Sequence, residues 1–259
     1  MPIWRWFVTP PLDGAENMAL DQALMDRARA TGEWLLRVYS WRRPTISFGR
    51  NQTARDCYDL DRVRGLGLGV VRRPTGGRAI LHHREVTYSV TAPVADAGEL
   101  RTSYARINDL LARGLRLLGA RAEVAPDSAR SSRPGPIPCF AEPSAGELVV
   151  DGRKLAGSAQ WRSDGALLQH GSILVGDDQS TLASLSLHPE REIPAPATLT
   201  EALGRAPTVE ETAAALRQSI VDLEGTEPVD VDWKSEESLR ARTAALIVRY
   251  EDDRWTWRR

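Results

Sequence analysis

Helical and strand periodicities alternate along this chain. Hydrophobic residues at spacings of three and four predict an amphipathic helix over 104–118 and another over 17–31, which Gly32 ends. Two more polar helices are predicted near the end of the chain, over 208–223 and 235–249, and Thr208 begins the first of them as a capping residue. The helices are therefore expected to cover a core with one face each.

Runs rich in β-branched and aromatic residues predict strands between these helices. The predicted strands are 4–8, 34–41, 44–49, 70–71, 79–82, 85–91, 121–124 and 166–175. Residues 147–160 add two strands around Asp151-Gly152, a two-residue hairpin signal. No internal repeat or long linker interrupts the pattern, so a single domain over 1–259 is expected.

Composition narrows the class of protein. With 259 residues, 42% of them hydrophobic, the chain can bury a full core. A net charge of -1 gives no global basic field, which argues against nucleic-acid and anionic-membrane partners. Two cysteines without a CxxC argue against a structural zinc site or a disulfide scaffold. Without a signal peptide or a long apolar run, the chain is expected to be cytoplasmic.

The candidate chemistry centres on Cys139. A thiol reacts as its thiolate, and a neighbouring Lys, Arg or His lowers the pKa of a cysteine from about 8.5 to roughly 3.5–7.5. The hairpin turn folds Lys154 back along the strand that follows Cys139, so Lys154 is the candidate cation. A lone cysteine is more often a buried hydrophobe. However, Cys139 follows the proline-rich stretch 131–138, which has the composition of a loop.

Two stretches are candidates for substrate binding. Gly157, Ser158 and Ala159 give their strand almost no side-chain bulk, so a ligand can approach its backbone closely. The loop 72–78 combines paired glycines with arginines, a combination that suits an anionic or carbonyl-bearing ligand. As a bare pattern, the same loop is also typical of an ordinary hairpin. Its candidate residues are Arg72, Arg73, Thr75, Gly76, Gly77 and Arg78. Adjacent His82 and His83 point to opposite faces of a strand, so no metal site is expected.

Several motifs in order resemble the biotin/lipoate protein ligase superfamily. They are 72–82, 85–89, Cys139-Phe140 with Pro143-Ser144, 152–160 and 169–174. Within it, the chain most resembles the cysteine-dependent octanoyl-acyl-carrier-protein:protein octanoyltransferases, from near residue 4 to near residue 257. One departure is Ala145-Gly146, where such transferases tend to carry an aromatic pair, and it bears on the lining of the pocket.

The resemblance implies an α+β fold with a mixed, largely antiparallel β-sheet flanked by helices, as in class II aminoacyl-tRNA synthetases and biotin synthetases. It also implies that octanoyl passes from acyl carrier protein to Cys139, and then to a lysine of a lipoyl domain or of the glycine-cleavage H protein. No cofactor is expected. Lys154 is expected to favour the thiolate and to accept the proton of the incoming lysine.

The resemblance assigns roles to the remaining residues as well. Backbone amides of Gly76, Gly77 or the Gly157 strand are expected to contact the oxyanion. The arginines of the 72–78 loop are expected to face the acidic carrier protein or its phosphate. His82 and His170 join the substrate-binding set, and His170 is either a proton carrier or a structural histidine.

Three alternatives stay open. An ATP-dependent lipoate-protein ligase would keep a third glycine in place of Arg78 and would need no cysteine at position 139. An amidotransferase would move octanoyl from the H protein to other lipoyl domains, also through a cysteine. A non-catalytic module that binds acyl groups or carrier proteins would keep the pocket but tolerate Cys139→Ser.

Overall fold

The computed structural model describes residues 2–126, 140, 144–187 and 194–259. Eight strands form the large sheet, in the order β11-β1-β2-β6-β10-β9-β8-β7. Its pairs are antiparallel from β2 to β7, whereas β1 runs parallel to both β2 and β11. The strands are β1 (Trp4–Val8), β2 (Trp34–Tyr39), β6 (Glu85–Pro93), β7 (Glu123–Val124), β8 (Leu148–Val150), β9 (Arg153–Ser163), β10 (Ala166–Leu174) and β11 (Val229–Asp230). The sheet is therefore mixed and largely antiparallel, as predicted.

Three further strands form a small separate sheet. β3 (Thr45–Phe48) is central, with β4 (Gly69–Arg72) parallel on one side and β5 (Ile80–His82) antiparallel on the other. The hairpin reading of residues 70–82 is thus wrong, because β4 and β5 do not pair with each other. Residues 73–79 instead cross the end of β3.

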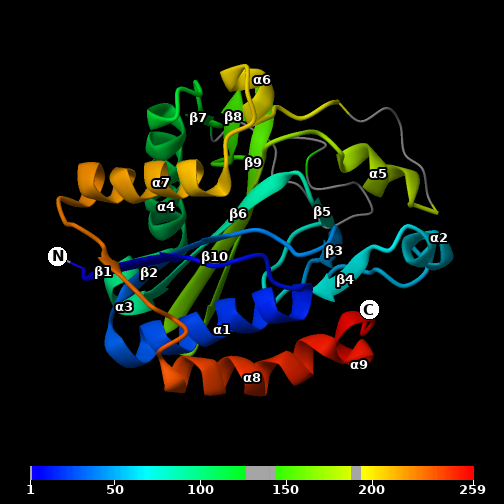
Figure 1. The fold of residues 1–259 in the computed structure, drawn as a ribbon, viewed down its shortest axis with the longest axis horizontal. Helices are drawn as coiled ribbons and strands as arrows, with labels where there is room; N and C mark the ends of the chain where they lie inside the picture. The colour runs from blue at the N-terminus through cyan, green and yellow to red at the C-terminus, as the bar shows by residue number, and fades with distance from the viewer. Residues whose placement is uncertain (1, 127–139, 141–143, 188–193) are drawn as a thin grey trace.

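Helices cover both faces of the large sheet (Figure 1). α1 (Gly14–Thr31) packs with α8 (Glu237–Glu251) on one face, and α4 (Leu100–Leu117) packs with α7 (Val209–Glu224) on the other. The shorter helices are α2 (Leu60–Gly65), α3 (Val94–Ala97), α5 (Gln179–Ser184), α6 (Leu199–Leu203) and α9 (Asp253–Thr256). α1 begins three residues earlier than predicted, because Asp13 and Glu16 form a capping box at its start. Within the part of the chain that is described, no helix has the length and hydropathy needed to span a bilayer.

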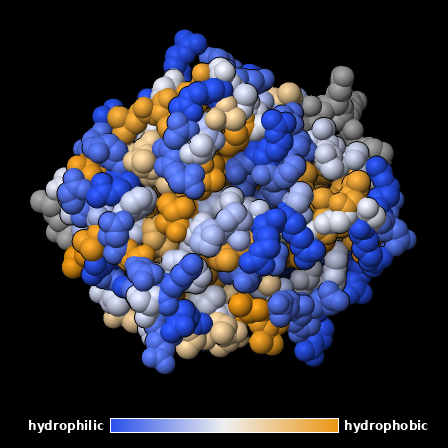
Figure 2. Space-filling view, in the orientation of Figure 1, coloured by the Kyte–Doolittle hydropathy of each residue, from blue (hydrophilic) through white to orange (hydrophobic). Residues whose placement is uncertain are grey.

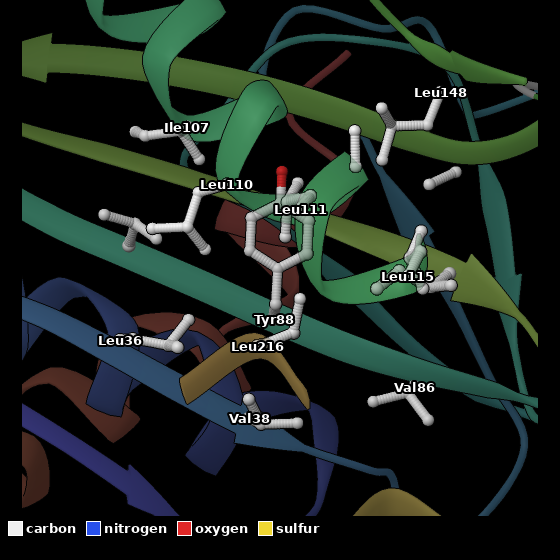
Figure 3. Close-up of a cluster of buried hydrophobic side chains, with 14 of the residues drawn as sticks. Leu36, Val38, Val86, Tyr88, Ile107, Leu110, Leu111, Leu115, Leu148 and Leu216 are labelled. Carbon is white, nitrogen blue, oxygen red and sulfur yellow. The ribbon is translucent and has the colours of Figure 1, made fainter. Parts of the chain in front are cut away.

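The core beneath α4 reaches the region of the site. Figure 3 shows leucines of α4 packed over side chains of β2 and β6, with the Tyr88 ring among them. Burial of each such leucine contributes about 1.5–3 kcal/mol. The Tyr88 hydroxyl leaves this core and lies 2.7 Å from Oγ of Ser158 on β9. The core thereby fixes the strand that carries the small residues.

Candidate active site

A cavity of about 180 Å³ lies between the two sheets and helices α1 and α4. The lining residues are Met18, Tyr39, Trp41, Ser47, Arg73, Gly77, Arg78, Ile80, His82, Thr87, Tyr104, Ser144, Glu147, Gly157, Ser158, Ala159, His170, Gly171 and Ser172. The mixture of aromatic, apolar and polar groups suits a ligand with an apolar tail and a polar head.

The small residues of β9 form one wall of the cavity. β8 begins at Leu148, opposite Ala156, so within the described chain β9 has only β10 beside it from Gly157 onward. Among the described residues, the backbone of Gly157, Ser158 and Ala159 therefore presents an edge that no second strand covers. Gly171 on β10 is required here, because a Cβ at this position would lie 2.4 Å from the Gly157 carbonyl oxygen.

The predicted hairpin turn is confirmed and sets up a buried ion pair. Asp151 and Gly152 have φ of 50° and 72°, the left-handed geometry of a type I′ turn. Across the hairpin, Lys154 Nζ lies 2.8 Å from the Glu147 carboxylate, and both side chains are buried. The second carboxylate oxygen of Glu147 accepts the backbone N–H of Ser144 at 2.7 Å. Glu147 lines the cavity, so the pair reaches its wall.

The segment around the expected nucleophile is described only in part. Cys139 lies outside the described residues. Phe140, the next residue in the sequence, is buried, and Lys154 Nζ lies 5.2 Å from the centre of its ring. An ammonium group at this distance from an aromatic ring is attracted to the ring face.

The loop after β4 is held by its own arginine. The Arg73 guanidinium donates to the carbonyls of Ser47 at 2.9 Å, Gly76 at 2.9 Å and Arg78 at 2.7 Å. The loop also packs on Gly49, where a Cβ would lie 1.9 Å from the Gly77 carbonyl oxygen. Arg73 therefore shapes this side of the cavity as well as lining it.

Arg72 does not lie where the sequence analysis placed it, in the substrate-binding loop of the site. It is fully buried and does not line the cavity. Its guanidinium donates to the carbonyls of Gly49, Gln52, Thr256 and Arg259. Burial and the nearby cationic arginines lower its pKa to about 10. Arg72 thus joins the C-terminal residues to the turn after β3, and it cannot face an acidic partner.

His170 belongs to a buried chain of hydrogen bonds. Its Nε2 lies 2.7 Å from Thr75 Oγ1, and its Nδ1 lies 3.0 Å from Asp21 Oδ2. The other carboxylate oxygen of Asp21 accepts a bond from Arg37 at 2.7 Å. Burial acts to raise the pKa of Asp21, but Arg37 and His170 outweigh it, so the pKa is lowered and Asp21 stays ionised. His170 thereby connects a fixed negative charge on α1 to the Thr75 loop.

His82 occupies another part of the wall. Trp41 stacks on its ring at 4.0 Å, and its Nε2 lies 2.8 Å from Ser47 Oγ. Its Nδ1 lies 3.7 Å from the buried carboxylate of Glu85. Burial lowers the pKa of His82 and outweighs the opposite effect of Glu85, so the imidazole is neutral near pH 7.

The cavity brings most of the predicted substrate-binding residues together. Those that line it are Arg73, Gly77, Arg78, His82, Gly157, Ser158, Ala159 and His170. Those behind the lining are Arg72, Thr75, Gly76 and Lys154. Glu147 was not predicted, although its place across the Asp151-Gly152 turn from Lys154 was a usable signal. Asp21 and Tyr104 come from distant helices and were not predicted as site residues.

The sequence matches a known protein family over most of its length. Residues 13–221 match the lipoyl protein ligase A/B catalytic domain. The chain belongs to this family. Among lipoyl protein ligase A/B relatives, octanoyltransferase LipM of Kyrpidia tusciae is 37% identical over the whole of both chains. Octanoyltransferase LipM of Geobacillus kaustophilus is 35% identical over 99% of each.

Solved structures agree on the fold. A putative lipoate protein ligase from T. acidophilum, solved with bound lipoic acid, superposes with a TM-score of 0.81 over the whole of both chains at 22% identity. A lipoate-protein ligase A bound with ATP gives a TM-score of 0.78 at 21% identity, over 99% of this chain and 98% of that one. At these identities the likeness concerns the fold alone. It confirms the predicted α+β class and the fold of lipoate-protein ligases.

Proposed function

We propose that this chain transfers octanoyl from octanoyl-acyl carrier protein to Cys139, and then to a lysine of a lipoyl domain or of the glycine-cleavage H protein. The chain is an octanoyltransferase of lipoate biosynthesis, as are its relatives. The carrier protein, the acceptor and the residue roles are our proposal. The proposal rests on the cavity next to the buried Lys154–Glu147 pair, because this cavity offers a place for an acyl chain and has a fixed cation directly behind the Glu147 wall.

The first step is an exchange of thioesters. The Cys139 thiolate attacks the carbonyl carbon of the donor thioester, and the bond from that carbon to the pantetheine sulfur breaks. The pantetheine thiolate leaves and takes up a proton. Backbone N–H groups of the Gly77 loop or of the β9 edge hold the oxyanion, a contact that supplies about 3–4 kcal/mol in acyl-transfer sites. The step is nearly isoenergetic and therefore needs no nucleotide.

The second step forms the amide. The neutral amine of the acceptor lysine attacks the acyl carbon, and the Cys139 thiolate leaves. The amine must lose a proton in this step. The sequence-based expectation gave this proton to Lys154, but an ammonium group cannot accept one. Lys154 is paired with Glu147, so the Glu147 carboxylate, which lines the cavity, receives the proton instead. Lys154 keeps its charge and stabilises the departing thiolate.

An intact-mass experiment tests the first step. The purified protein is mixed with octanoyl-acyl carrier protein and no nucleotide. A gain of one octanoyl group is expected, lost in Cys139→Ala and retained in Cys57→Ala. Cys57 is the matched control because it is the other cysteine of the chain and lies outside the cavity lining.

Other outcomes would indicate the alternatives. If no adduct forms without ATP, but free lipoate is attached to a lipoyl domain when ATP is added, the protein is a ligase. If the adduct forms from octanoyl H protein and not from the carrier protein, it is an amidotransferase. Binding of the octanoyl carrier protein without an adduct would indicate a non-catalytic module.

A further inference from the structure

Four arginines gather beside the cavity wall, outside the site described above. They are Arg50, Arg249, Arg258 and Arg259, from the turn after β3, the end of α8 and the C-terminal residues (Figure 1). The carbon centres of the Arg249 and Arg258 guanidinium groups lie 3.8 Å and 4.0 Å from the Trp255 ring centre. Arg258 also donates to the carbonyl of Arg50. The aromatic and backbone contacts hold several like charges in one place.

Among the described residues, no carboxylate forms an ion pair with a member of this arginine cluster. The buried Nη1 of Arg50 has no hydrogen-bond partner among the described residues. Three carboxylates, Glu251, Asp252 and Asp253, lie between Arg249 and Arg258 in the sequence. Asp252 and Asp253 accept bonds from Arg254 and Trp257 instead of from the cluster. The chain as a whole is near neutral at -1, so this local positive charge is not a property of its composition.

The pKa of Arg258 shows that the positive charges of the cluster lie close to one another. Burial lowers the pKa of Arg258, and the charges of Arg50, Arg259 and Arg249 lower it further. Figure 2 shows hydrophobic residues scattered among hydrophilic ones on the visible face. The arginine cluster is therefore described as a surface by its charge.

The cluster adjoins the cavity through two short connections. The backbone N–H of Arg50 donates to the Thr75 carbonyl at 2.7 Å, two residues before the cavity residue Gly77. The Arg50 guanidinium lies 5.0 Å from the ring of Trp161, which follows the cavity residue Ala159 by two positions on β9. A macromolecule bound at the cluster is therefore positioned at the same site.

We propose that the arginine cluster is the docking surface for the donor, an acidic protein that carries its acyl group on a phosphodiester-linked arm. This inference rests on the proposed function. Guanidinium groups form paired hydrogen bonds with both carboxylates and phosphates, and the donor offers both. A lysine-bearing acceptor domain offers carboxylates only. The all-arginine composition of the cluster therefore favours the donor.

The test measures binding without turnover. Titration calorimetry gives the dissociation constant of octanoyl-acyl carrier protein for three proteins, all of which carry Cys139→Ala. The first has no other change. The second, the cluster variant, also carries Arg249→Gln and Arg258→Gln, and the third, the control, also carries Arg116→Gln and Arg240→Gln. The last pair is the matched control, because it removes two exposed arginines elsewhere on α4 and α8. The cluster variant should bind about tenfold more weakly, or about 1.4 kcal/mol. The control should stay within about twofold of the unchanged protein.

Salt dependence gives a second measurement that does not depend on how a variant folds. Binding to the otherwise unchanged Cys139→Ala protein should weaken as ionic strength rises, because exposed charge pairs are screened. Circular dichroism confirms that the cluster variant is folded. Failure of the proposed function would appear separately, as absence of the Cys139 adduct in the native protein, whatever the binding data show.

Four results would overturn the docking surface. Three of them are an unchanged dissociation constant in the cluster variant, an equal loss in the control, and salt-independent binding. The fourth comes from carrier protein without its phosphopantetheine arm. If it binds the unchanged protein and the cluster variant equally, the cluster recognises only the phosphate, and protein docking at the cluster is excluded.

Discussion

Replacing Glu147 by glutamine tests the buried ion pair through the stability of the fold. The change keeps the shape of the side chain but removes the negative charge 2.8 Å from Lys154 Nζ. Only 2% of the Lys154 side chain and 7% of the Glu147 side chain are exposed, so solvent screens the pair weakly. Removing one partner of a buried pair typically costs about 3–5 kcal/mol. We expect about 3 kcal/mol, because the glutamine oxygen can still accept a hydrogen bond.

Urea unfolding followed by circular dichroism measures this loss. In a thermal experiment, the same loss corresponds to a midpoint lower by about 6–12 °C, at about 2–4 °C per kcal/mol for a domain near this size. Glu201→Gln is the matched control. Its carboxylate pairs with Arg153 at 3.1 Å on the same hairpin, but these side chains are about half exposed, so the change should cost less than about 1 kcal/mol.

A double-mutant cycle isolates the interaction itself. Glu147→Gln and Lys154→Met are measured singly and together, and the double variant should lose about 1–3 kcal/mol less than the sum of the single losses. Additive losses would refute the reasoning, since the two groups would then not interact energetically. Equal effects of Glu147→Gln and the surface control would refute it as well.

Three further predictions concern other parts of the site. Gly49→Ala should lower the thermal midpoint and reduce the octanoyl adduct, because its Cβ would collide with Gly77, whereas Gly65→Ala, with nothing within 4 Å, should do neither. Because the pKa of His82 is lowered in the folded protein, the unfolded chain binds the proton more readily. The free energy of unfolding should therefore fall as pH drops through about 6.5. Urea unfolding between about pH 7.5 and 5.5 should show a smaller fall of this free energy in His82→Gln than in the unchanged protein. Arg72→Met should lower the free energy of unfolding by about 3–4 kcal/mol in the same assay, because three buried hydrogen bonds and one part-buried hydrogen bond to carbonyls are lost. A loss below about 1 kcal/mol would contradict the structural role of Arg72.

Elements with a strong local signal could be predicted from the sequence. Asp151-Gly152 adopts the predicted turn because both positions tolerate positive φ. The helix predicted over 208–223 is observed over Val209–Glu224, with Thr208 and Glu211 in a capping box. The helix predicted from Tyr104 starts earlier, at Leu100, because its first turn carries little of the apolar periodicity. In these places, turn and capping residues close together in the sequence were enough to predict the element.

The division into two sheets could not be predicted in the same way. β3 pairs with both β4 and β5, and no local sequence feature states which strand stands between two others. Paired glycines after Val70-Val71 therefore indicated a hairpin that does not exist. The same limit explains Arg72, whose carbonyl partners at Thr256 and Arg259 lie more than 180 residues away.

In the candidate site, too, residues with a local signal were predicted and residues placed by distant packing were missed. The small residues 157–159 were found because their lack of bulk is visible in the sequence, and they line the cavity. Asp21 and Tyr104 were missed because they reach the site from helices on opposite faces of the large sheet. Their roles depend on packing between distant segments, which hydrophobic periodicity alone does not specify.

The central claim concerns an acyl group held on one sulfur atom, and a chase experiment tests it most directly. The octanoylated protein is separated from its donor and mixed with a lipoyl domain in the absence of nucleotide, and both masses are followed over time. The account predicts that the octanoyl group disappears from the Cys139 peptide at the rate at which it appears on the acceptor lysine. Octanoyl that stays on the protein while the acceptor remains unmodified, or that is carried by another residue, would contradict it.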